Sequence, residues 1–159
     1  MRCITAASHN FQIFKLVNLQ INMWICPLCN QQFVNTNQVH SCRDKELSDF
    51  LNGKTQHTIE LFDHLVIEYK QIGDVKVHPA KSMISFAART RFAYVIQLGK
   101  NFIDVVFPFK QPYEDNLCFS KIKPVPGSDD YNHHLRLYFK EDINGEVKKY
   151  MRMAYENGC

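Results

Sequence analysis

The stretch SMISFAARTRFAYVIQLGKNFIDVVFPF (82–109) contains three runs of alternating apolar and polar residues, separated by short turns. A period of two residues is typical of β-strands that bury one face. The runs therefore predict strands over 82–88, 91–98 and 102–109 that pair as an antiparallel meander. In the second strand, the alternation places these residues on the buried face: Phe92, Tyr94, Ile96 and Leu98.

Strands and helices are also predicted on both sides of this stretch. Shorter alternating runs predict strands over 75–79, 117–123 and 134–139. Apolar residues at helical spacing predict amphipathic helices over 56–73 and 141–158, and a short connecting helix over 44–53 has Asp44 as its expected N-cap. We expect an α+β fold in which about six antiparallel strands carry both amphipathic helices on one face and leave the other face free.

Length and composition fit one globular domain with a small appendage. The 159 residues are 45% apolar and 13% aromatic, which is unlike a disordered chain. The net charge of +3 neither favours nor excludes a nucleic-acid partner, so any positive patch must be local. The chain has no run of about 18 apolar residues, and residues 1–22 lack the continuous apolar segment of a signal peptide. We expect no membrane partner and a cytoplasmic location.

The chain divides into three segments at the sequence level. Residues 1–22 lack a helical period and precede Met23, so we interpret them as a disordered extension or as residues upstream of the true start. Residues 23–43 form a zinc-finger-like module, and residues 44–159 form the α+β domain.

The segment CPLCNQQFVNTNQVHSC (26–42) has the ligand spacing of a zinc site. Cys26 and Cys29 form a C-x2-C pair, and His40 and Cys42 supply a second pair. Four ligands leave no open coordination position, so we expect a structural Zn²⁺ rather than a catalytic one. Two alternatives remain open: unmetallated cysteines packed in a core, and a redox pair formed by Cys26 and Cys29. The helix expected before His40 lacks basic residues, which weakens a nucleic-acid role for this module alone.

Several motifs together resemble one protein family. These are W-x-C-P-x-C-x3-F-x4-Q-x-H-S-C, F-x2-G-K, LFDHL, K-x2-I-x-F-x5-F-A-Y-V, HH-x-R-L and AYENG, in this order from Trp24 to Gly158. The chain resembles bacterial members of the family called domain of unknown function 5655. The resemblance implies a cytosolic bacterial protein with a zinc-finger-like head on an α+β domain, and an association with defence proteins, but it implies no activity.

The free face of the predicted sheet is the expected binding surface. Residues 76–123 contain eight Lys and Arg residues against three acidic residues. We expect a cationic face with a floor of small residues, and its candidate ligand-binding residues are Lys81, Arg89, Arg91, His134 and Arg136. An ordinary solvated face with Arg–Asp pairs between strands is the alternative.

Three functions are compatible with these patterns. The first is a non-enzymatic binding module whose cationic face binds an anionic ligand, a nucleic acid or a protein partner. The second is an enzyme that acts on a phosphorylated or nucleic-acid substrate through His133 or His134, with Lys81, Arg89 and Arg91 nearby. The third is a role in protein interaction alone. The sequence contains none of the common nucleotide-binding or metalloprotease motifs, so the first interpretation is preferred.

Overall fold

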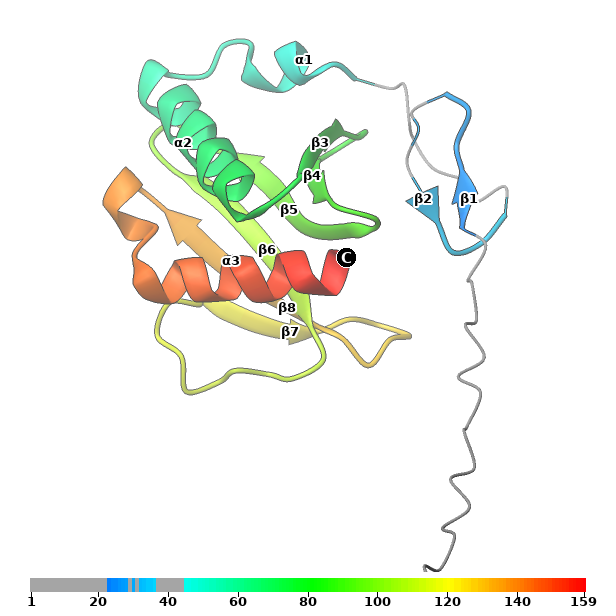
Figure 1. The fold of residues 1–159 in the computed structure, drawn as a ribbon. Coiled ribbons are helices and arrows are strands. Elements are labelled where there is room, and N and C mark those ends of the chain that lie inside the picture. The colour runs from blue at the N-terminus through cyan, green and yellow to red at the C-terminus, as the bar shows by residue number, and fades with distance from the viewer. Residues whose placement is uncertain (1–22, 29, 31, 37–44) are drawn as a thin grey trace, which may run out of the picture.

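The computed structural model describes residues 23–28, 30, 32–36 and 45–159 (Figure 1). Near the N-terminal end of this range, β1 (Trp24–Ile25) and β2 (Gln32–Phe33) form a two-stranded antiparallel sheet. We call the described residues 23–36 the head. The predicted extension over 1–22 and the predicted metal ligands Cys29, His40 and Cys42 lie outside the described residues.

A six-stranded antiparallel sheet forms the centre of the larger domain. Its strands are β3 (Lys76–Pro79), β4 (Ile84–Ala87), β5 (Arg91–Leu98), β6 (Ile103–Phe109), β7 (Lys121–Pro124) and β8 (Tyr131–Leu137). Their order across the sheet is β3-β4-β5-β6-β8-β7. The predicted α+β class is therefore confirmed. The meander holds for β3 to β6, but β8 lies between β6 and β7.

Strand β7 starts later than predicted, and strand β8 starts earlier. The predicted strand 117–123 begins instead at Lys121, because residues before it form turns in which the side chain of Asn116 accepts a hydrogen bond from Cys118 N. Strand β8 starts at Tyr131 rather than at residue 134. Its fully buried residue His133 is polar, and this hides the alternating pattern.

Both amphipathic helices cover the same face of the sheet (Figure 1). They are α2 (Gln56–Ile72) and α3 (Gly145–Gly158), and a short 3-10 helix, η1 (Lys140–Asp142), precedes α3. In the core, Tyr69 of α2 contacts the ring of Phe86 with centroids 4.6 Å apart. The side chain of Asn144 accepts hydrogen bonds from Glu146 N and Val147 N, so α3 begins at residue 145 rather than 141.

The connecting helix α1 (Leu47–Leu51) is shorter than predicted. Its N-cap is Glu46, whose backbone N–H donates to the Asp49 carboxylate, whereas the predicted cap Asp44 lies outside the described residues. Gly53 follows the helix with a positive φ of 70°, in agreement with its predicted role as a stop. In the described part of the chain, no helix is long and apolar enough to cross a membrane.

Two bulges change which residues of β5 face the helices. The pairing register shifts at Phe86/Ala87 against β5 and again between Val95 and Gln97 against β6. The predicted buried positions of Tyr94 and Ile96 are therefore wrong: Tyr94 pairs with Ser85 on the opposite face, and Ile96 is 39% exposed. A bulge places two residues opposite one, and a strict alternation cannot show this.

Candidate functional site

The sheet face opposite α2 and α3, here called the open face, carries one continuous row of side chains. Each residue of the row is the register partner of the next one on the neighbouring strand. In order across the sheet they are His78, Ser85, Tyr94, Val106, His134 and Lys121. The row crosses all six strands because every strand contributes one residue. Paired residues share a face of the sheet, so these six side chains lie side by side.

The first group on the open face is the β3–β5 cluster, defined as Lys76, His78, Arg91 and Tyr94. It stands on a floor made by Ser85 and Ala87, which are both fully buried. The Ser85 hydroxyl donates to the backbone oxygen of His78 at 3.1 Å, so the floor is internally satisfied. The cluster is therefore polar and cationic above a floor of small residues.

Two polar atoms of this cluster are buried without a partner. Arg91 Nε and His78 Nε2 have no hydrogen-bond partner, and the only other such side-chain atom in the described residues is Tyr69 Oη in the core. Burial, followed by the charges of Arg91 and Lys76, lowers the pKa of His78. Burial also raises the pKa of Tyr94, against the effect of Arg91. Buried donors that lack acceptors are uncommon in native proteins, and an absent ligand is one accepted explanation.

The position of Arg91 is fixed from two sides. The backbone oxygen of Gly158, at the end of α3, accepts hydrogen bonds from Arg89 N and Thr90 N, both at 2.9 Å. These bonds hold the β4–β5 turn immediately before Arg91. From the head, the ring of Phe33 lies 5.7 Å from the Arg91 guanidinium carbon, and Arg89 Nη2 lies 3.6 Å from Met23 Sδ. The head is therefore part of the environment of the cluster.

A second basic group, the β7–β8 cluster, lies at the other end of the row. It consists of Lys121, Lys123 and His134, and register places Lys121 beside His134. No carboxylate in the described part of the chain forms an ion pair with either lysine. The Lys123 ammonium lowers the pKa of Lys121, and burial followed by Lys121 lowers the pKa of His134. This end of the face therefore also carries positive charge without a paired anion.

Residues 47–158 match the model of one protein family, described as a domain of unknown function, DUF5655. The chain belongs to the DUF5655 family. The match covers α1 to α3 and leaves out the cysteine segment. No curated protein and no solved structure matches the chain.

The other predicted binding residues of this DUF5655 domain lie outside the β3–β5 cluster. Lys81 is exposed in the β3–β4 turn, and Arg89 is exposed in the β4–β5 turn. Arg136 lies on the open face, but its Nε and Nη2 atoms donate to the Asp104 carboxylate at 2.7 and 2.8 Å. The guanidinium also stacks on Phe102 at 4.1 Å, so its charge is already compensated. Arg136 is therefore paired with an aspartate of the neighbouring strand, which is the alternative that the sequence left open to a role in ligand binding.

Sequence reasoning missed three residues of the cluster. Lys76 and His78 are two residues apart in β3, so the predicted strand already implied that their side chains share one face. Tyr94 was assigned to the buried face because the bulges in β5 have no signal in the alternation. His134, in contrast, lies on the open face as predicted.

His133 is a structural residue of the DUF5655 core. It is fully buried, its Nδ1 lies 2.9 Å from the Tyr131 backbone oxygen, and its Nε2 accepts from Tyr113 N at 3.2 Å. Burial lowers its pKa, against the effect of its backbone hydrogen bonds. Both ring nitrogens are occupied by the backbone, so neither is available to a substrate.

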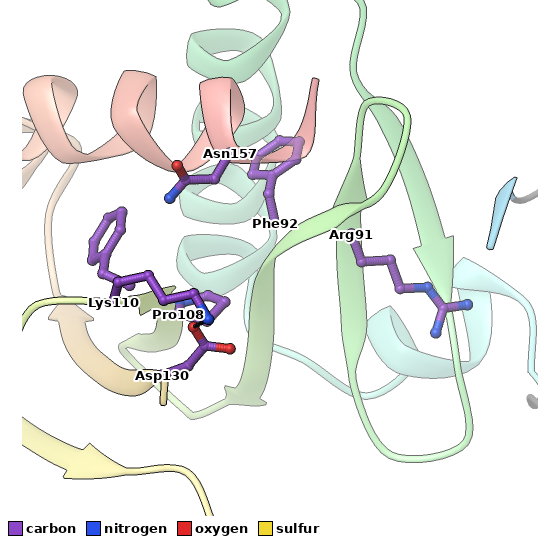
Figure 2. A pocket seen from close by; sticks show the side chains of 7 residues that line it. Arg91, Phe92, Pro108, Lys110, Asp130 and Asn157 are labelled. Carbon is purple, nitrogen blue, oxygen red and sulfur yellow. Dashed lines mark ion pairs between the residues drawn. The ribbon is translucent and has the colours of Figure 1, made fainter. Parts of the chain in front are cut away.

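A hollow of about 300 Å³ lies on the other side of the β5 backbone from the Arg91 guanidinium (Figure 2). Phe92, Pro108 and Asn157 contribute to its lining, and its two opposite charges, Lys110 and Asp130, form an ion pair at 3.0 Å. Figure 2 shows the Arg91 side chain pointing away from this pair. Arg91 also lines the hollow, but its guanidinium points away and Lys110 is neutralised by Asp130, so the hollow is a weaker candidate for an anion site than the β3–β5 cluster.

The described part of the cysteine segment forms a tight turn around Cys26. Leu28 N lies 3.4 Å from Cys26 Sγ, and Asn30 N donates to the Cys26 backbone oxygen at 2.8 Å. Asn30 has a positive φ of 56°. Among the described residues no group of three or more metal-ligand side chains occurs, and the other three predicted ligands fall outside them.

Proposed function

We propose that this DUF5655 protein is a non-enzymatic binding module that holds an anionic ligand on the open face, at the β3–β5 cluster. The observation that carries this proposal is the pair of buried, unpartnered atoms Arg91 Nε and His78 Nε2. An anion supplies the acceptor that Arg91 lacks, and His78 also donates when its Nε2 carries the proton. Lys76 adds charge beside them, and Tyr94 adds a hydroxyl donor.

The proposal includes a structural Zn²⁺ held by Cys26, Cys29, His40 and Cys42. The turn at Cys26 supports this part, because a backbone N–H directed at the sulfur favours the thiolate that a metal requires. Bound Zn²⁺ supplies a cross-link to a segment too small to form a core of its own. A reducing cytoplasm, the location that we propose, keeps these thiols available to the metal.

The alternative of an enzyme that uses His133 or His134 has less support. Both ring nitrogens of His133 already bond to the backbone. His134 is half-buried on the open face, where it lies beside Lys121 in the pairing register. Its position suits ligand contact, and no observation on the described residues favours a catalytic role for it.

Calorimetric titration of the full chain with inorganic pyrophosphate tests the anion site. We expect Arg91→Ala to weaken binding about tenfold or more, because a charge-assisted hydrogen bond is lost. Arg152→Ala is the matched control, since it removes the same charge from an exposed position on α3. Circular dichroism checks that both variants fold. Equal affinity in the two variants, or no binding by the unmodified protein, refutes the anion site.

A further inference from the structure

The two basic clusters lie at opposite ends of the same row of the open face, with Val106 between Tyr94 of the first and His134 of the second. From this arrangement we propose that the open face binds single-stranded nucleic acid, with the backbone running across the strands from the β3–β5 cluster to the β7–β8 cluster. The inference rests on the proposed function, because it names the class of anion that the face takes.

The outer ends of the two clusters lie too far apart for one small anion to contact both. Strands β3 and β7 are the two edges of the six-stranded sheet, so five strand spacings separate them. At about 4.8 Å for each spacing, His78 and Lys121 are about 24 Å apart. One phosphate reaches one cluster, whereas a strand of roughly four to seven nucleotides reaches both.

The charges at the far end support an extended polyanion. Lys121 and Lys123 lie two residues apart on β7, and both point to the open face beside residues of β8. Neither forms an ion pair within residues 45–159. The carboxylate of Asp104 on this face is held by Arg136 and does not repel a phosphate strongly. Phosphates along one strand match this distribution of charge.

The aromatic side chains along the row favour a nucleic acid over an acidic peptide. The row offers the half-buried rings of His78, Tyr94 and His134 at intervals across the sheet. Aromatic rings on a sheet surface stack on unpaired bases, which an acidic peptide does not possess. Bases are accessible to such rings in a single strand and are stacked inside a duplex, so a single strand is the better fit.

Fluorescence anisotropy with a labelled eight-residue oligothymidylate and the full chain tests this inference. We expect Lys121→Ala/Lys123→Ala to weaken oligonucleotide binding about tenfold at low salt and to lower the salt slope by about 1.4, the value for two lost phosphate contacts. The double variant Lys70→Ala/Lys149→Ala is the control, because it removes two exposed lysines from α2 and α3 and should bind normally. Pyrophosphate affinity should be unchanged in both double variants.

A second pair of variants tests base stacking. Tyr94→Leu should weaken oligonucleotide binding about fivefold or more, whereas Tyr94→Phe should weaken it less, because it keeps the ring and loses only the hydroxyl donor. Oligoglutamate of equal charge serves as the competitor. If oligoglutamate displaces the oligonucleotide equally well and Tyr94→Leu has no effect, the partner is an acidic peptide and the inference is wrong. If Arg91→Ala abolishes pyrophosphate binding while Lys121→Ala/Lys123→Ala leaves oligonucleotide binding intact, only this inference fails and the anion site stands.

Discussion

His133 shows how one buried polar residue shapes both the fold and its response to pH. Its Nδ1–H donates to the Tyr131 backbone oxygen, and its Nε2 accepts from Tyr113 N. A second proton on this ring removes the acceptor for Tyr113 N and places a charge among the rings of Phe109 and Phe119. The folded protein therefore favours the neutral imidazole.

The unfolding free energy should fall as the pH drops from 8 to 5.5. Burial lowers the pKa values of His133, His134 and His78 in the folded state, so the unfolded chain takes up protons first, near pH 6.5. Stability is retained above the unfolded pKa and lost below it. Urea denaturation at a series of pH values measures this, and His133→Gln should show a smaller decrease than the unmodified protein. A rise in stability towards pH 5.5 would contradict the burial of these rings.

At the residue scale, the sequence predicted Arg91 and His134 on the open face, and both are there. It did not predict the pairing of Arg136 with Asp104, because that contact depends on the register between β6 and β8. Charge and residue type are visible in a sequence. The partner of each charge depends on how distant strands pair, and this pairing is not visible in a sequence.

At the level of elements, α3 and the β4–β5 hairpin are built against each other. Gly158 ends α3, and an added Cβ there would lie 2.6 Å from Phe92 Cδ1 and 2.9 Å from Phe92 Cβ. The second atom is anchored to β5 and cannot rotate away. The periodicity of the sequence predicted this helix, but its start at Gly145, after the Asn144 cap, and its close contact with Phe92 depend on capping and packing.

Gly158→Ala should lower the unfolding free energy by about 1–3 kcal/mol, because the added methyl group overpacks against Phe92. Gly145→Ala in the first turn of the same helix is the matched control, since nothing lies within 4 Å of its added Cβ. This control should be neutral or stabilising by up to about 1 kcal/mol. Chemical denaturation compares the unfolding free energies of the two variants. Equal effects would show that the close contact with Phe92 does not destabilise Gly158→Ala.

At the scale of the whole molecule, the sequence predicted the two-layer fold better than the strand order. Alternating runs identified β3 to β6 and the helical stripes identified α2 and α3, since each pattern is local. The insertion of β8 between β6 and β7 was missed, because a pairing between distant segments leaves no periodic signal. The contact between the head and the open face, through Phe33 and Arg91, was missed for the same reason.

This contact predicts that the proposed metal in the cysteine segment and the proposed anion on the sheet would affect each other. The ring of Phe33 lies 5.7 Å from the Arg91 guanidinium carbon, in reach of a cation–π contact. We infer that this contact limits the positions open to the guanidinium. Removal of Zn²⁺ from the head should release Phe33 and weaken pyrophosphate binding.

We expect about a threefold loss of pyrophosphate affinity in protein from which zinc has been removed by a chelator and the chelator then dialysed away. Phe33→Leu should cause a similar loss with zinc still bound, because it removes the ring alone. Arg91→Ala should bind weakly whether or not zinc is present, since it lacks the group that the ring orients. Calorimetric titration measures the unmodified protein and Arg91→Ala with and without zinc, and Phe33→Leu with zinc. If the zinc-free protein binds pyrophosphate as tightly as the metal-loaded protein, the head does not contribute to the anion site, and the site belongs to the DUF5655 domain alone.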